Sequence, residues 1–272
     1  MPPITVDEKL CTGCGICSRI CPGRIIIQPE DKKIPYVPDE LENMCINCGH
    51  CEAFCPENAL LAGSPPGVIN PVFKGAGEIT PEDIGIYLKK RRSIRNYKTQ
   101  PVSRDTILDI LDIARYAPSG CNAQSVGWTV VYEREKVKRI SALTIEWMKT
   151  LLNTPHPMAA FAPGLISAWE SGYDIICRGA PHLLVAHAPK TNPLAQVDSI
   201  IALSHFETAA GAYGVGTCWA GFVAGAAMFY EPISKELEIP KDRLFSNALM
   251  FGYPQFVPHA IPKRNNPTIN WL

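Results

Sequence analysis

The chain has 272 residues, of which 46% are hydrophobic and 19% charged, an ordinary composition for a globular protein. Its 26 basic and 26 acidic residues balance, so the net charge gives no reason to expect nucleic acid or an anionic membrane as a partner. No apolar run approaches the ~18 residues of a membrane span, and the N-terminus lacks the basic and apolar parts of a signal peptide, so we expect a cytoplasmic location.

Cysteine is concentrated near the N-terminus, where residues 11–22 and 45–56 repeat the spacing C-x2-C-x2-C-x3-C-P. A disulfide scaffold would also be rich in cysteine, but it belongs to secreted chains. Zinc sites prefer two C-x2-C pairs separated by a long spacer. Three thiols in one tight run suit three corners of an iron–sulfur cube, with the fourth cysteine reaching across to the other cluster. The spacing therefore favours an iron–sulfur domain.

Residues 5–62 resemble a bacterial-type ferredoxin with two [4Fe-4S] clusters. The glycines at 13, 15 and 49 are expected to supply backbone dihedrals that let N–H groups approach the clusters. Residues 25–37 are expected to form a short hairpin. The ligand sets that the resemblance implies are Cys11, Cys14, Cys17 and Cys55 for one cluster, and Cys45, Cys48, Cys51 and Cys21 for the other.

The composition predicts a small domain over residues 1–63, a linker rich in glycine and proline over 64–79, and a second domain over 80–272. Helices alternate with strands in the second domain, which predicts an α+β or α/β fold. Thr80 and Ser103 are expected to cap its first two helices. The expected helices cover 81–91, a segment after 103 with Leu108 on its apolar face, 134–152 and an apolar segment at 195–213, and the strands cover 128–132 (buried), 181–189 and 247–254.

Three polar stretches of the second domain have ordinary explanations when each is taken alone. RRSIR at 91–95 could be a solvated helix end, APSGCNAQ at 117–124 a capping turn, and the basic pair near residue 263 a surface tail. In this order, and with GVGTCWAGF at 214–222, they resemble the nitroreductase family of FMN flavoproteins. The resemblance implies an α+β domain with a central sheet flanked by helices, and a homodimer with FMN at its interface.

The same resemblance implies which residues bind FMN, while no catalytic side chain is assigned. Guanidinium groups suit a phosphate because they form bidentate, charge-assisted hydrogen bonds. The sequence departs from the family pattern at QSVGW, where Q-P-W is common, and at Ala220, where some members carry an acidic residue. The implied contacts are Arg91, Arg92, Ser93, Lys263 and Arg264 at the phosphate and ribityl end, Arg95 near N1 and O2 of the ring, Ser119, Asn122 and Gln124 at the ring edges or ribityl hydroxyls, and the backbone amides of Ala220 and Gly221 near the reactive face.

Together the two resemblances predict a ferredoxin–nitroreductase fusion, an oxidoreductase that passes electrons from [4Fe-4S] clusters to FMN and on to an organic acceptor. The expected acceptor is a small nitroaromatic molecule, and the expected donor is a low-potential protein such as ferredoxin. The alternatives are a non-catalytic module for electron storage, a flavin-directed enzyme, and a reductase of quinones or enones. The histidines at 182, 187 and 205 are expected to be packing or polar core residues and not metal ligands, because their spacing matches no metal site.

Overall fold

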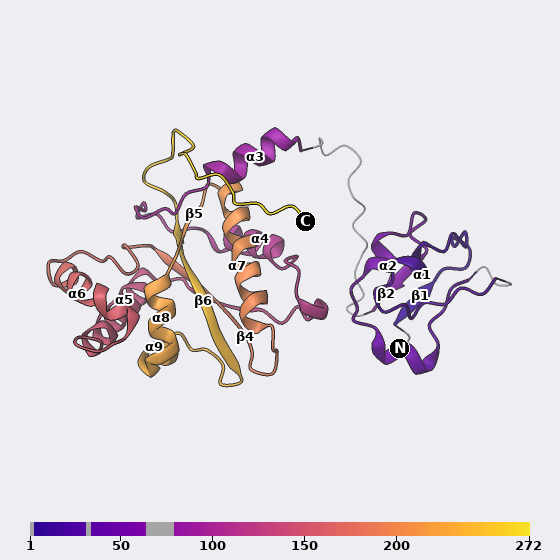
Figure 1. Ribbon diagram of the computed structural model, residues 1–272, viewed down its shortest axis with the longest axis horizontal. Helices are drawn as coiled ribbons and strands as arrows, with labels where there is room; N and C mark the ends of the chain where they lie inside the picture. Colours follow the sequence, from indigo (N-terminus) through magenta and orange to yellow (C-terminus); the bar gives the residue numbers. More distant parts are fainter. Residues whose placement is uncertain (1–2, 31–33, 64–78) are drawn as a thin grey trace. The chain divides into compact units, whose positions relative to one another are not determined.

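The computed structural model describes residues 3–30, 34–63 and 79–272. The chain divides into two compact units, Met1–Glu78 with the short segment Gly120–Ala123, and Ile79–Ser119 with Gln124–Leu272. Figure 1 shows the elements of each unit. Nearly all of the predicted linker, residues 64–78, lies outside the described residues.

The first unit is built around a two-stranded antiparallel sheet. Strand β1 (Ile4–Val6) pairs with β2 (Leu60–Ala62), so segments from the two ends of the unit lie side by side. Between them come α1 (Ile16–Ile20), the 3-10 helix η1 (Asp39–Met44) and α2 (His50–Ala53). Its buried apolar cluster comprises Ile4, Ile25, Ile26, Cys51 and Leu60. A core of this size provides little stability without additional cross-links or metal centres.

The expected hairpin over residues 25–37 is limited to a single bridge in the structure. Ile27 and Tyr36 form an antiparallel bridge with backbone hydrogen bonds of 2.8 and 2.9 Å. No strand is assigned to the described residues of this segment, and residues 31–33 lie outside them.

The second unit has the predicted α+β architecture, with a four-stranded antiparallel sheet. The strand order is β3 (Gly127–Val131), β4 (His182–Pro189), β6 (Arg243–Gly252) and β5 (Gly216–Trp219). Every residue of β4 before Pro189 is buried. The expectation of a buried strand at 128–132 is wrong: β3 lies at an edge of the sheet, and Val131 alone of its five residues is buried.

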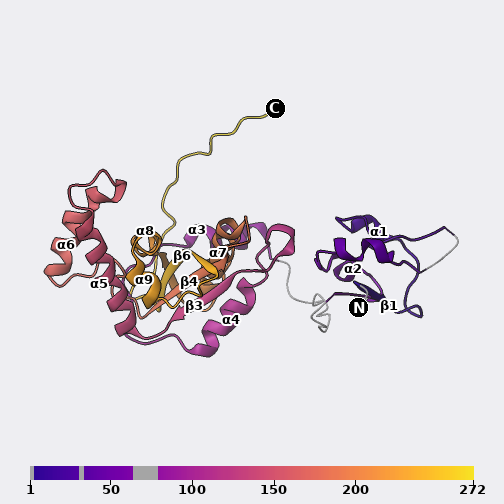
Figure 2. The same cartoon turned by 90° about the horizontal axis from the view of Figure 1, so that it is seen from below.

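Helices cover both faces of this sheet. Because successive side chains of a strand point to opposite faces, Leu183 and Val185 belong to one buried cluster and Leu184 and Ala186 to the other. Figure 2 shows the two groups of helices on either side of the strands. The first cluster contains residues of α5 (Arg134–Thr150), α6 (Ala162–Glu170), α8 (Gly221–Phe229) and α9 (Glu231–Glu236), and the second contains residues of α4 (Arg104–Ala114) and α7 (Ala195–Ala212).

Both predicted helix caps are confirmed. Thr80 accepts a hydrogen bond from the Asp83 amide at the start of α3 (Pro81–Lys90), and Ser103 accepts one from the Thr106 amide at the start of α4. The expectation for Leu108 is wrong, because its side chain is 62% exposed. The buried face of α4 comprises Ile107, Ile110 and Ala114, whose helical spacing directs Leu108 away from the core.

The sequence patterns did not predict the shorter elements. Strand β5 and helix α8 arise within and after the glycine-rich stretch at 214–222, and the 3-10 helices η2 (Gly120–Asn122) and η3 (Pro157–Phe161) also went unpredicted. Residues 255–272 are exposed and contain no helix or strand. Among the described helices, none has the length and apolar character needed to span a membrane.

Candidate metal centres and cofactor site

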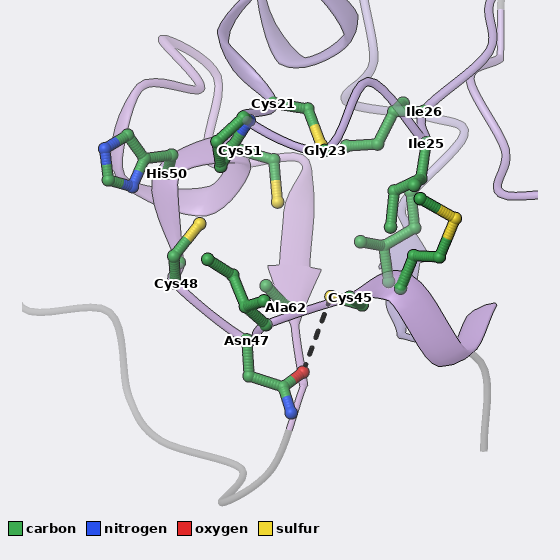
Figure 3. Close-up of a pocket in the computed structure, with 15 residues that line it drawn as sticks. Cys21, Gly23, Ile25, Ile26, Cys45, Asn47, Cys48, His50, Cys51 and Ala62 are labelled. Carbon is green, nitrogen blue, oxygen red and sulfur yellow. Dashed lines mark hydrogen bonds between the residues drawn. The ribbon is translucent and has the colours of Figure 1, made fainter. Parts of the chain in front are cut away.

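Four cysteines surround a cavity of about 240 Å³ in the first unit. Three of them, Cys45, Cys48 and Cys51, come from the second cysteine run, and Cys21 comes from the end of the first. In Figure 3 the sulfur atoms of Cys21, Cys48 and Cys51 point into the same space. The structure therefore brings together the second predicted ligand set, including its cysteine from the other run.

The remaining four cysteines line a second, smaller cavity of about 20 Å³. Here Cys11, Cys14 and Cys17 of the first run meet Cys55, the last cysteine of the second run. The first predicted ligand set is thus also brought together.

The backbone of the two cysteine runs repeats along with the sequence. Gly15 and Gly49 precede α1 and α2 with φ values of +70°, and Gly13 has a φ of +72°. Asn47, which stands 34 positions after Gly13, also has a positive φ, of +50°. Positive φ values are accessible to glycine and tolerated by asparagine. The conformations expected of the three glycines are confirmed.

Burial makes thiolates costly at these sites. Burial, together with charge repulsion from the neighbouring thiols of Cys48, Cys21 and Cys45, raises the pKa of the Cys51 thiol to about 11. Burial also raises the pKa of Cys17. Among the described residues, no three histidine, cysteine or acidic side chains converge closely enough to hold a single metal ion. The four cysteines instead surround a volume, which is the arrangement that a polynuclear cluster requires.

A different cavity, of about 290 Å³, lies in the second unit between the end of α3, α7 and β5. Its basic residues are Lys90, Arg91 and Arg92, and its acidic residue is Glu207. Arg91 and Arg92 therefore occupy one cavity, as expected for residues that bind the same anionic group.

Glu207 is a functional candidate that the sequence interpretation missed. Its side chain is 9% exposed, and its Oε1 lies 3.1 Å from Nη1 of Arg91. It also accepts hydrogen bonds from Thr217 Oγ1 at 3.1 Å and from Trp219 Nε1 at 3.2 Å. The signal in the sequence was an acidic residue inside the apolar helix at 195–213, a position where an unpaired charge would be costly.

Close backbone approach fixes the RRSIR segment against β5. The Ile94 amide donates a hydrogen bond to the Thr217 carbonyl at 2.8 Å. A Cβ atom on Gly216 would lie 2.6 Å from Cγ1 of Ile94, which is shorter than any normal contact. Gly216 is therefore required for this approach.

Apart from Arg91 and Arg92, none of the predicted FMN contacts is among the described residues that line this cavity. Arg95 donates from Nη1 to the Ser93 carbonyl at 3.5 Å. In the predicted loop, Ser119 Oγ accepts from the Gln124 amide at 3.0 Å, and Asn122 and Gln124 both have positive φ.

The remaining predicted FMN contacts are the backbone amides of Ala220 and Gly221 and the two basic residues of the C-terminal tail. The Ala220 amide donates to the Ala248 carbonyl at 2.9 Å, so the expectation that it is offered to a ligand is wrong. Gly221 occupies the first position of α8. Lys263 and Arg264 lie on the exposed C-terminal segment.

The root of that segment is held beside the RRSIR segment. Pro254 forms an antiparallel bridge with Tyr97, flanked by hydrogen bonds from Lys98 N to Tyr253 O at 2.8 Å and from Gln255 N to Asn96 O at 3.0 Å. Pro254 and Val257 line the same cavity as Arg91.

Comparison with known proteins matches both units to families. Residues 88–253 match the nitroreductase family, and residues 10–60 match the 4Fe-4S dicluster domain. An FMN reductase [NAD(P)H] of Bacillus subtilis (strain 168) is 30% identical over 172 residues, 61% of this chain and 64% of the relative. A putative NAD(P)H nitroreductase of the same strain is 24% identical over 189 residues, 66% of this chain and 88% of the relative. The chain thus spans less than two thirds of the FMN reductase.

Solved structures show the same fold for the second unit. A nitroreductase with bound FMN from Bacteroides fragilis has a TM-score of 0.56 and 19% identity, covering 70% of this chain and 99% of its own. A nitroreductase with bound FMN from Desulfitobacterium hafniense has a TM-score of 0.54 and 22% identity, covering 68% and 96%. The chain belongs to the nitroreductase family, and a 4Fe-4S dicluster domain precedes its nitroreductase domain.

Proposed function

We propose that this chain is an FMN-dependent oxidoreductase that carries electrons from two [4Fe-4S] clusters to FMN and on to a small organic acceptor. The observation that carries the proposal is the pair of four-cysteine cavities, each completed by the last cysteine of the other run, in a chain of the nitroreductase family. When bound, a [4Fe-4S] cluster supplies single-electron transfer and FMN supplies two-electron transfer to an acceptor.

The eight N-terminal cysteines are proposed to hold the clusters. Each run supplies three closely spaced thiols and contributes its final thiol to the other site. The left-handed conformations at Gly15 and Gly49 turn the backbone between the second and third cysteine of each run. The ligand sets are Cys11, Cys14, Cys17 and Cys55, and Cys45, Cys48, Cys51 and Cys21.

The charge of the cavity at the end of α3 supports the proposal that it binds the phosphate end of FMN. Lys90, Arg91 and Arg92 exceed the single carboxylate of Glu207, so the lining has a positive balance for an anionic group. Close packing at Gly216 holds the arginine-bearing segment in place. The residues proposed to bind FMN are Arg91, Arg92, Ser93, Lys263 and Arg264 at the phosphate and ribityl end, Arg95, Ser119, Asn122 and Gln124 at the ring and ribityl chain, and the Gly221 amide near the reactive face.

The proposed acceptor is a nitroaromatic molecule, with quinones and enones as related acceptors. No side chain needs to act as an obligatory acid or base if solvent supplies the protons. The proposed assembly is a homodimer with FMN at its interface, since helix α7 leaves Val197 54% exposed and Ile200 39% exposed. The proposed donor is a low-potential electron-transfer protein such as ferredoxin.

Cofactor loading of the full chain, purified without oxygen, tests this proposal. We expect about eight iron atoms and about one FMN per chain, because each cluster contains four irons. We also expect nitroaromatic turnover when reduced ferredoxin is the donor. A chain that takes up zinc in place of iron and binds no flavin would contradict the proposal, and a loaded chain inactive on every acceptor would indicate a module for electron storage.

A second candidate function is the reduction or transfer of flavin as a substrate. The 30% identity to an FMN reductase favours this candidate. Equilibrium dialysis separates the two, since a tightly held flavin at one per chain indicates a cofactor and a weakly held, exchangeable flavin indicates a substrate.

A further inference from the structure

We propose that Glu207 is a positioning residue for FMN binding, which fixes Arg91 and strand β5 in the arrangement that the cofactor requires. This inference rests on the proposed function, because it concerns the same cavity. Glu207 is on α7, Arg91 follows α3, and its two other partners are on β5. A single buried carboxylate therefore connects three elements around the cavity.

The contacts of Glu207 satisfy both carboxylate oxygens. Oε1 accepts from Arg91 Nη1 and from Thr217 Oγ1, each at 3.1 Å, and Oε2 accepts from Trp219 Nε1 at 3.2 Å. Thr217 and Trp219 are two positions apart, so they project from the same face of β5. A buried charge is stable when it is paired and hydrogen-bonded in this way.

The same contacts limit the freedom of Arg91. Its side chain is 37% exposed and would otherwise sample many rotamers in water. The bond to Glu207 occupies one guanidinium nitrogen, which leaves the other N–H groups available for a phosphate. An arginine that is already oriented loses less entropy when it binds the phosphate.

Strand β5 connects this anchor to the other end of the predicted FMN site. Trp219 ends β5, and Gly221, the proposed ring-facing amide, begins α8 two residues later. The Thr217 carbonyl also accepts a hydrogen bond from the Ile94 amide, and this bond joins β5 to the arginine-bearing segment. Glu207 therefore fixes the positions of the phosphate-binding and ring-binding parts of the site relative to each other.

Charge alone predicts the opposite effect of removing this carboxylate. Glu207 lowers the positive balance of a lining that contains Lys90, Arg91 and Arg92. If Glu207 acted only through its charge, its removal would strengthen the binding of FMN, whose phosphate carries about −1.5 to −2 charges at neutral pH. A positioning role predicts weaker binding, so the direction of the change separates the two.

The test is a double-mutant cycle on FMN affinity in the full chain. Flavin is removed from the wild type, Glu207→Gln, Arg91→Ala and the double variant, and FMN is titrated back while its fluorescence is followed. We expect Glu207→Gln to weaken binding by about tenfold or more. In the Arg91→Ala background the same substitution should have a much smaller effect, because Glu207 acts largely through Arg91.

Two further variants control for structural damage. Glu236→Gln breaks a comparable ion pair, with Arg139 at 2.8 Å between α9 and α5, and should leave FMN affinity unchanged. Thr217→Val removes one of the other donors to Glu207 and should weaken FMN binding less than Glu207→Gln does. Melting curves and cluster absorption identify any variant that is misfolded.

Unchanged or tighter FMN binding by folded Glu207→Gln would overturn the inference, and so would additive effects in the cycle. These outcomes differ from a failure of the proposed function, in which the wild type itself would bind no FMN. If the wild type binds FMN and Arg91→Ala weakens it while Glu207→Gln does not, the cofactor site stands and the role of Glu207 is refuted.

Discussion

Two buried histidines are held in their neutral form by the hydrogen bonds that they accept. Nε2 of His182 accepts from the Val102 amide at 2.9 Å while Nδ1 lies 2.7 Å from the Tyr132 carbonyl, so Nδ1 carries the proton. Nδ1 of His187 accepts from Arg243 Nε at 2.6 Å. These contacts confirm that both histidines are polar core residues. His205, whose Nδ1 lies 3.0 Å from the Ile201 carbonyl, is only half-buried and lies outside the core.

Acid should therefore destabilise the second unit through these histidines. Burial lowers the pKa of His182 below its ordinary 6.5, and burial and then Arg243 lower the pKa of His187. Below pH 6.5 these histidines bind protons in the unfolded chain but stay neutral in the folded chain until a lower pH. The free energy of unfolding therefore falls as pH falls, by at most ~1.4 kcal/mol per pH unit for each histidine. Urea unfolding between about pH 7.5 and 5.5 measures this slope.

The control for this effect is His182→Gln. A glutamine amide can donate to Tyr132 and accept from Val102 without titrating. The variant should show a shallower dependence of unfolding free energy on pH than the wild type. An identical slope would contradict the assignment of His182 as a source of acid sensitivity.

Cys21 tests the exchange of cysteines between the two runs. If Cys21 completes the site of Cys45, Cys48 and Cys51, Cys21→Ser should damage that cluster first. Iron content should fall from about eight towards about four atoms per chain. Cys121→Ser is the control, because this exposed cysteine lines neither cysteine cavity and its loss should leave iron unchanged. Full iron content in Cys21→Ser would exclude the proposed ligand set.

At the scale of elements, the sequence was informative where a local signal has one physical solution. Side-chain chemistry predicted the caps at Thr80 and Ser103, and helical periodicity predicted the long helix that begins at Arg134. The two caps are local in this sense, because each forms between residues three positions apart. The spacing of the repeated cysteine runs indicated three thiols on one centre, and the resemblance to a bacterial ferredoxin implied that the fourth thiol comes from the other run.

The features that were missed depend on tertiary contacts. Strand β5 has four residues and begins with glycine, so its pairing with β6 is set by the sheet and not by propensity. The edge position of β3 is a property of strand order, which a single apolar run does not encode. Glu207 could be recognised as an anchor only once Arg91 and Trp219, distant in sequence, were seen together.

Strand β5 also offers a test of packing around the cofactor cavity. Gly216→Ala would place a Cβ 2.6 Å from Ile94 and should destabilise the second unit by about 1–3 kcal/mol while weakening FMN binding. Gly164→Ala, in α6, is the control, since its added Cβ meets nothing within 4 Å and should stabilise the helix slightly. Thermal unfolding compares them, and equal stability of the two variants would contradict the packing argument.

For the whole molecule, the presence of a cluster domain ahead of the nitroreductase domain predicts the choice of donor. Reduced ferredoxin should support faster turnover than NADPH, because the chain supplies its own route for single electrons. Steady-state rates with each donor measure this preference, and faster turnover with NADPH alone would defeat it. In Cys21→Ser the ferredoxin-driven rate should fall while FMN binding is retained, which separates electron delivery from cofactor binding.

The bridge between Tyr97 and Pro254 has a further consequence for the exposed C-terminal segment. Lys263 follows Pro254 by nine residues, so a fully extended chain carries it no more than about 30 Å from that root. The charges of Lys263 and Arg264 are thus confined to a limited volume around Pro254, which lines the cavity that also contains Arg91. Such tethering raises the effective concentration of the two cations around the cavity, which should favour the capture of an anion from solution.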